Sequence, residues 1–130
     1  MESFKHNFLF TPIPLSSFIE KYLKSKPYVN PNYVLFAEEK GRLVGLAFCL
    51  PDIFHSASKR IILKTLARLP GKEYAGLGNE LTVGIYEQAK LDGITGIYHA
   101  FMHNANASKG MSEQFSGKEW RQYRLFGKTL

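Results

Sequence analysis

The sequence contains a single cysteine, no long hydrophobic run and no cluster of basic residues. Cys49 lies in an apolar segment and has no second cysteine for an internal disulfide, which is typical of proteins from a reducing cytoplasm. No segment approaches the roughly 20 apolar residues of a membrane span. Residues 1–7 lack the charged-then-apolar pattern of a signal peptide. We therefore expect a cytoplasmic protein without a membrane segment.

The charge balance is basic, with 17 Lys and Arg against 11 Asp and Glu and a net charge of +6. Such charge can attract an anionic ligand or nucleic acid. However, the basic residues stand singly along predicted strands, with neither a Lys/Arg run nor a helix-turn-helix pattern. This distribution disfavours nucleic-acid binding, and most of these charges are expected to form a solvated face.

Length and composition predict one globular domain. The chain has 130 residues, of which 45% are hydrophobic, enough for one core but not for two. The hydrophobic pattern gives an element order of roughly β-α-β-β-β-α-β-α-β, which predicts an α/β fold with a mixed sheet flanked by helices. The predicted strands are 33–37, 43–50, 60–69, 93–103 and 117–130, with a short apolar piece at 7–14 in the place of a first strand. The predicted helices are 14–23, 77–90 and 108–115.

The most informative segment is the turn at residues 70–78, between the third long strand and the second helix. A strand that turns through glycines into a helix presents unpaired backbone N–H groups and the positive end of the helix dipole. Gly76 and Gly78 lack a Cβ, so a bulky anion can approach the backbone there. This geometry suits a phosphate or pyrophosphate, although glycines at such a place can also simply make a turn.

The spacing in this turn resembles the acetyl-CoA-binding signature of the GNAT superfamily of N-acetyltransferases. Pro70, Gly76 and Gly78 stand at the matching places, while Glu73 replaces the usual Arg or Gln and Tyr74 replaces a common Gly. The resemblance extends to the C-terminal part of the chain through Asn106-Ala-Ser108, Gly117 and Tyr123-Arg-Leu-Phe126. It implies that residues 1–130 form one GNAT-like acetyl-CoA-binding domain, in which residues 1–30 are a shortened front end.

The resemblance implies acetyl-CoA as co-substrate and no metal. The pantetheine arm would bind the backbone of the third long strand and touch the amide at position 106, and the glycine turn would hold the pyrophosphate. The implied cofactor-binding residues are Leu66, Ala67, Arg68, Glu73, Tyr74, Ala75, Gly76, Leu77, Gly78, Asn79 and Asn106.

The catalytic residues remain unassigned. Many GNAT relatives carry a tyrosine acid seven residues after the asparagine, and this chain has Glu113 there. Other candidate acids in the same region are Tyr98, His99, His103 and Tyr123, and candidate bases are Glu38, Glu39 and Asp52. His99 and His103 have no cysteine or carboxylate cluster beside them, so the sequence predicts no metal site.

Three functions agree with these residues. The first is transfer of an acetyl group from acetyl-CoA to an amine of an unknown small molecule or protein. The second is CoA binding without catalysis, which Glu73 and Glu113 favour. The third is a part-domain whose acceptor cleft is completed by a partner, which the short front end favours.

The aromatic C-terminal segment raises the possibility of self-association. Trp120, Tyr123 and Phe126 either form part of a homodimer contact or fill the core of the monomer.

Overall fold

The computed structural model describes residues 4–5, 11–55, 57–124 and 126–127. Within these residues the helices and strands follow the order α-β-β-β-α-β-α, which agrees with the middle of the predicted order. The elements are helices α1 (Leu15–Ser25), α2 (Leu77–Leu91) and α3 (Ala107–Gln114), and strands β1 (Val34–Glu39), β2 (Arg42–Pro51), β3 (Arg60–Arg68) and β4 (Gly96–His99). Short 3-10 turns stand at Lys26–Tyr28, Pro31–Tyr33, Ile53–His55 and Lys72–Tyr74.

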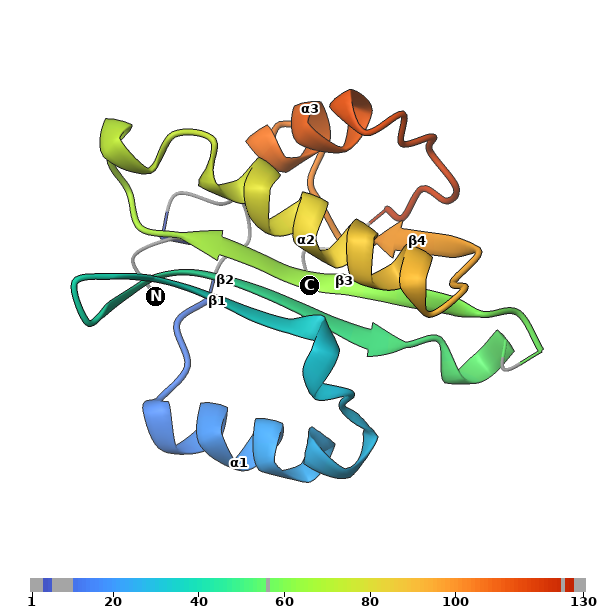
Figure 1. Ribbon diagram of the computed structural model, residues 1–130, viewed down its shortest axis with the longest axis horizontal. Coiled ribbons are helices and arrows are strands. Elements are labelled where there is room, and N and C mark those ends of the chain that lie inside the picture. Colours follow the sequence, from blue (N-terminus) through green and yellow to red (C-terminus); the bar gives the residue numbers. More distant parts are fainter. Residues whose placement is uncertain (1–3, 6–10, 56, 125, 128–130) are drawn as a thin grey trace.

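The strands form one mixed sheet in the order β1-β2-β3-β4. The first three strands are antiparallel, and β4 runs parallel to β3 because α2 crosses over between them. Figure 1 shows α2 and α3 on one face of this sheet and α1 on the other. The predicted α/β fold with a mixed sheet flanked by helices is therefore confirmed.

The core lies between α2 and the sheet. The predicted apolar stripe of α2 faces inward, and Leu81, Ile85 and Ala89 are buried. They pack with residues of β2 and β3 that point to the same face, including Ala47, Cys49, Ile61 and Leu63. Gly45 allows this approach, because a Cβ there would stand 3.0 Å from both Leu77 and Leu81. The absence of a side chain at Gly45 thus lets the first turns of α2 lie close to β2.

The opposite face of the sheet is only partly covered. α1 has no buried residue, and Leu15, Phe18, Ile19 and Leu23 remain exposed. Its recorded ring contact with the sheet joins Tyr22 to Phe48, with centroids 5.6 Å apart. Among the described residues, no helix has both the length and the apolar character needed to cross a bilayer.

The closing strand predicted at residues 117–130 is not present in its described part. Residues 117–124 form no strand, and positions 125 and 128–130 lie outside the described residues. Instead, Trp120 stacks loosely on Tyr98 and Tyr123 on Phe101, with centroids 5.9 and 5.5 Å apart. The aromatics do not fill the core, since Trp120, Tyr123 and Phe126 are mostly exposed. Their contact with a second copy stays a prediction.

Two other predicted strands are shorter than expected or lie partly outside the described residues. Of the strand predicted at residues 93–103, the structure forms only β4. Of the one predicted at 7–14, residues 7–10 lie outside the described residues and 11–14 have no regular structure. A strand needs a neighbouring edge, and β4 has one for four residues only.

Candidate active site

The sheet opens between β3 and the chain that follows β4. Pairing of these two strands ends where Leu63 meets His99, and the Ala100 N–H donates the last bond to the Leu63 carbonyl at 3.3 Å. β3 continues for five more residues, from Lys64 to Arg68. We call the space between residues 64–68 and the chain after His99 the β3–β4 opening.

The register of β2 and β3 shows which backbone groups face this opening. The Leu69 N–H donates to the Val44 carbonyl at 2.9 Å, so Leu69 and Ala67 bond toward β2 in the antiparallel ladder. The N–H and C=O groups of Leu66 and Arg68 therefore point the other way, toward the opening. Of the three strand residues predicted to bind a cofactor through the backbone, two face the opening and Ala67 faces β2.

A register shift at Lys64 produces this arrangement. Phe48 pairs with Thr65 and Cys49 with Leu63, so Lys64 is an extra residue in β3. Leu63 and Leu66 consequently both pack against the core, although they are three positions apart. A bulge of this kind bends its strand and increases the local twist. It stands at the point where β3 and β4 separate.

The start of α2 lies just beyond the carboxyl end of β3, as the glycine turn predicts (Figure 1). Gly76 is the N-cap in the left-handed conformation, with φ 88°, and no side chain caps the helix. The first helical bonds run from the N–H groups of Asn79 and Glu80 to the Gly76 carbonyl. The N–H groups of Leu77 and Gly78 precede these bonds and have no helical partner, so within the described part of the chain they can bind an anion.

The side chains around this turn are held away from the first helical N–H groups. Glu73 folds back over Gly71, where a Cβ would collide with its carboxylate. The Arg68 guanidinium donates to the carbonyls of Leu69 and Gly71 at 3.0 and 3.2 Å. Tyr74 reaches Glu39 at 3.5 Å. Ala75 continues the turn, and its N–H donates to the Lys72 carbonyl at 3.0 Å.

α3 packs over the first turns of α2. The Asn79 amide donates to Gln114 at 3.2 Å, and the Met111 sulfur accepts a weak bond from Thr82 at 3.8 Å. Asn106 is the N-cap of α3, and its side chain forms no capping bond. Glu113, at the position of the relatives' tyrosine, is exposed. The predicted cofactor residues thus lie on β3, on the α2 turn and at the start of α3.

A hydrogen-bonded group of three side chains lies beneath α3. The two ring nitrogens of His99 contact the Ser112 hydroxyl and, at 3.0 Å, the Tyr86 hydroxyl. Burial lowers the pKa of His99 and raises the pKa of Tyr86. Sequence reasoning named His99 but neither of its partners, because the bonds join β4 to α2 and α3. The available signal was strand alternation, which places His99 on the core-facing side with Ile97.

Acidification is expected to destabilise the protein through His99. Its pKa in the folded protein is below the ordinary 6.5, so the unfolded chain binds the proton more readily. The contribution to the free energy of unfolding is complete above pH 6.5 and is lost as the pH falls toward the folded pKa. Urea unfolding between about pH 8 and pH 5 measures this decline. It should be weaker in His99→Gln, and an equally steep decline in that variant would contradict the assignment.

The remaining catalytic candidates divide by position. Tyr98 lies beside the opening and accepts a bond from Arg60 at 2.6 Å. Asp52 is buried at the opposite end of β3, where it pairs with His55 at 3.0 Å. Glu38 and Glu39 end β1, two strands away from the opening. His103 and Tyr123 are exposed on the chain after β4. Among the described residues, no three potential metal ligands gather.

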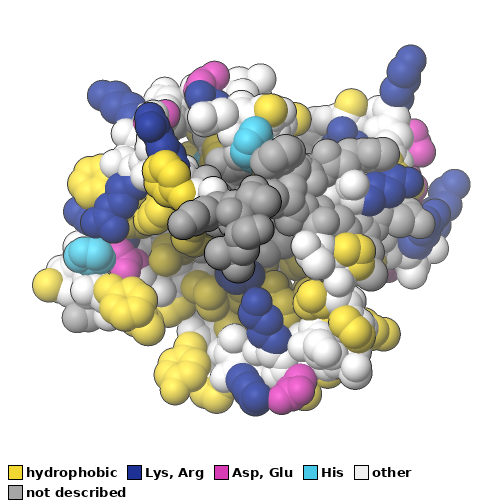
Figure 2. All heavy atoms as spheres, turned by 180° about the vertical axis from the view of Figure 1, so that it is seen from behind, with side chains coloured by type: hydrophobic (Ala, Val, Ile, Leu, Met, Phe, Trp, Pro, Cys, Tyr) yellow, Lys and Arg dark blue, Asp and Glu magenta, His cyan; other side chains and the backbone are white. Residues whose placement is uncertain are grey.

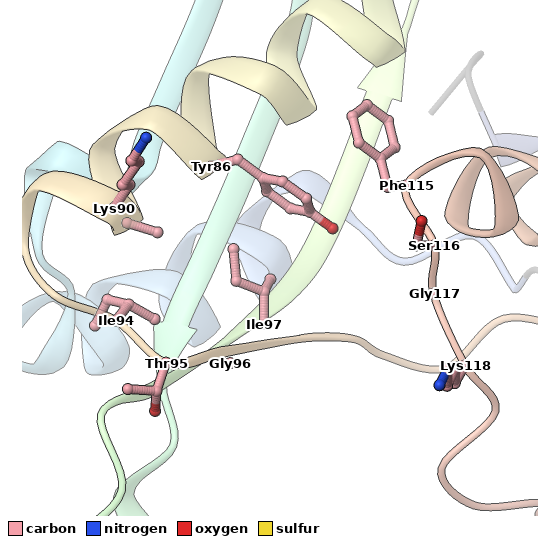
Figure 3. A pocket seen from close by; sticks show the side chains of 11 residues that line it. Tyr86, Lys90, Ile94, Thr95, Gly96, Ile97, Phe115, Ser116, Gly117 and Lys118 are labelled. Carbon is pink, nitrogen blue, oxygen red and sulfur yellow. The ribbon is translucent and has the colours of Figure 1, made fainter.

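A pocket of about 500 Å³ lies away from the glycine turn. Figure 3 shows it between the second half of α2, the chain entering β4 and residues 115–118. Tyr86 and Phe115 meet edge to face above it, with centroids 5.2 Å apart. Ile94, Ile97, Lys90 and Lys118 also line it. None of the predicted cofactor residues lines this pocket. The candidate cofactor site is therefore at the β3–β4 opening and not in this pocket.

Comparison with solved structures shows the fold. The aminoglycoside N-acetyltransferase AAC(6')-Iy, solved with a CoA bisubstrate analogue, matches with a TM-score of 0.67 and 12% identity over 94% of this chain and 85% of its own. A ribosomal-protein-alanine N-acetyltransferase from Brucella melitensis biovar Abortus 2308 matches with a TM-score of 0.64 and 14% identity. The match covers 88% of this chain and 82% of that protein's chain. A transcriptional regulator from Bacillus halodurans C-125 matches with a TM-score of 0.68 and 18% identity. The match covers 95% of this chain and 83% of that protein's chain.

These similarities identify the chain's architecture as the GNAT N-acetyltransferase fold. No protein-family model matches the sequence, and no curated protein sequence matches it.

Proposed function

We propose that this chain is a single acetyl-CoA-binding domain that transfers the acetyl group to an amine. The observation that carries the proposal is the coincidence of two features at one end of β3. The backbone of Leu66 and Arg68 faces an opening in the sheet, and the uncapped start of α2 follows directly. The fold similarity to enzymes solved with CoA supports the same function.

The residues at the turn fit a pyrophosphate. A Cβ at Gly76 would have no atom within 4 Å, so the space before the helix is open. The N–H groups of Leu77 and Gly78 would hold the phosphates, and Asn79 is held beside them by Gln114. The backbone of Leu66 and Arg68 would hold the pantetheine arm, with Asn106 on the facing side. The turn from Glu73 to Ala75 would border the pyrophosphate of the bound acetyl-CoA.

Acetyl-CoA supplies a thioester whose carbonyl carbon accepts the amine. The C–N bond forms as the C–S bond breaks, the amine loses a proton and the sulfur gains one. A strand N–H that faces the opening can donate to the carbonyl oxygen as charge develops on it. Tyr98 and His99 stand at the end of β4, beside this place, and are the side chains we would test first for proton transfer.

A thermal-shift titration with acetyl-CoA, CoA and ATP tests the proposal. We expect both acetyl-CoA and CoA to raise the melting temperature and ATP to raise it less, because the pantetheine contacts are missing. A thiol-release assay over a panel of amines then separates transfer from binding alone. Binding without release for every amine would favour the non-catalytic alternative. A concentration-dependent activity with a change in sedimentation would favour completion by a partner subunit.

Replacing Glu73 with arginine is expected to tighten CoA binding modestly. Glu73 is exposed and next to the turn, and the change removes one negative charge and adds a positive one beside the phosphates. Solvent screening limits the gain to about 1 kcal/mol or less. Glu87→Arg on the far part of α2 makes the same change in net charge and should leave affinity unaltered. Calorimetric titration measures both; weaker binding by Glu73→Arg would contradict the expected gain.

A further inference from the structure

The amine acceptor must approach from the face of the sheet that carries α1. α2 and α3 lie on the other face, together with the proposed phosphate site (Figure 1). The β3–β4 opening joins the two faces, and among the described residues α1 covers only part of its own face. On the proposed function, the side chains that border the opening on this face would meet the acceptor. This inference rests on the proposed function.

Lys64 borders the opening on that face. It is the extra residue of β3, next to the last residue that pairs with β4. Its Nζ donates to the Tyr22 hydroxyl of α1 at 3.1 Å and lies 5.2 Å from the centre of the Tyr22 ring. The Lys64 ammonium group is therefore held on the α1 side by two weak interactions, and the Lys64 side chain remains exposed.

A second cation lies along the same face. Arg60 and Tyr98 both point away from the core, because their strand neighbours Ile61, Ile97 and His99 point into it. The Arg60 guanidinium donates to the Tyr98 hydroxyl at 2.6 Å and lies over its ring at 5.7 Å. Trp120 covers the same ring. This face of β3 and β4 thus carries cationic groups next to aromatic ones.

The two strands themselves carry no acidic side chain, although Asp52 bonds the Arg60 backbone and Glu119 precedes Trp120. β3 and β4 contain Arg60, Lys64 and Arg68 but no Asp or Glu. On α1, Glu20 is paired with Lys24 at 2.7 Å. In Figure 2, hydrophobic side chains with basic ones among them lie in the lower part of the view, where α1 is. Nothing on the two strands compensates the charge of a cationic acceptor.

We propose that the acceptor is a small amine that also carries a carboxylate, such as an amino acid with an apolar or aromatic body, and that Lys64 binds this carboxylate. An ammonium beside Lys64 is disfavoured, which lowers the pKa of the acceptor amine and increases its reactive neutral fraction. The same repulsion disfavours polycations. The chain would therefore differ in acceptor from the aminoglycoside acetyltransferases whose fold it shares.

Matched amines that differ only in the carboxylate test this assignment. With acetyl-CoA saturating, kcat/KM is measured for phenylalanine against phenethylamine, for lysine against cadaverine, and for spermidine. We expect each amino acid to exceed its decarboxylated partner by about tenfold or more and spermidine to be the poorest acceptor. Calorimetric binding of phenylalanine and phenethylamine to the CoA-saturated protein should show the same order.

Variants of Lys64 assign the preference to this side chain. Lys64→Gln should raise KM for phenylalanine about tenfold, leave KM for phenethylamine nearly unchanged, and remove the ratio between them. Lys64→Arg should retain the preference, and Lys90→Gln on α2 is the matched control. Lys64 is exposed, so these variants should fold.

The outcomes separate this inference from the proposed function. If acetyl-CoA fails to bind, the proposed function is wrong and the acceptor assignment is lost with it. If acetyl-CoA binds but cadaverine, phenethylamine or spermidine is acetylated as well as the amino acids, only the acceptor assignment is overturned. Binding of acetyl-CoA with no turnover of any of these amines also overturns it.

Discussion

Replacing Gly76 with glutamate should weaken acetyl-CoA binding by about 100-fold or more, because the new carboxylate meets the pyrophosphate where the helix dipole would otherwise attract it. The fold should survive, since a Cβ at this position has no atom within 4 Å. The left-handed backbone at φ 88° adds a cost of about 1–2 kcal/mol to stability. Calorimetric titration with acetyl-CoA measures the affinity, and thermal unfolding checks that the variant is folded.

Two control variants separate charge from backbone strain. Gly76→Gln has the same strain and nearly the same size without the charge, and it should retain much more affinity than Gly76→Glu. Gly93→Glu places the acid at another left-handed glycine, beyond the opposite end of α2 and about 22 Å along the helix. It should lose stability but bind acetyl-CoA as the parent does. Equal affinity in Gly76→Glu and the parent would move the phosphate site elsewhere.

Replacing Ile85 with alanine should cost about 2–5 kcal/mol of unfolding free energy, a large part of the total for a domain of this size. Ile85 is fully buried at the centre of the contact between α2 and the sheet. Its loss leaves a cavity beneath the helix that carries the proposed phosphate site. Urea unfolding measures the effect, and acetyl-CoA should partly restore the stability of the variant by binding only to its folded form.

Graded replacements on the same helix provide the comparison. Ile85→Val removes one methylene and should cost only about 0.5–1.5 kcal/mol. Val83 lies two positions earlier and is 42% exposed, so Val83→Ala should cost roughly 0.5 kcal/mol or less. A cost for Ile85→Ala no larger than that for Val83→Ala would contradict the position of α2 on the sheet.

The sequence predicted the part of the molecule that depends on local patterning. The strand expected at residues 60–69 is β3, and the helix expected from residue 77 is α2, with Leu81, Ile85 and Ala89 buried as their spacing requires. The glycine turn between them could be recognised because helix starts and left-handed positions favour particular residues. These elements hold most of the predicted cofactor residues.

Features that depend on pairing between distant segments could not be predicted. The bulge at Lys64 has no marker in the sequence of β3, yet it turns Leu66 and Arg68 toward the opening. The bonds of His99 join β4 to α2 on one side of the sequence and to α3 on the other, so Tyr86 and Ser112 could not be named beforehand. The aromatic residues 117–124 suit a strand by composition, but strand formation also requires an available edge, which composition does not report.

Backbone amide NMR during titration with CoA tests the central claim most directly, because the proposed contacts are mainly N–H groups. We predict the largest shifts at Leu66, Arg68, Gly76, Leu77 and Gly78, with a smaller shift at Asn106. Residues lining the pocket of Figure 3, such as Ile94 and Thr95, should change little. Shifts concentrated at that pocket, or an unchanged spectrum at saturating CoA, would contradict binding at the β3–β4 opening.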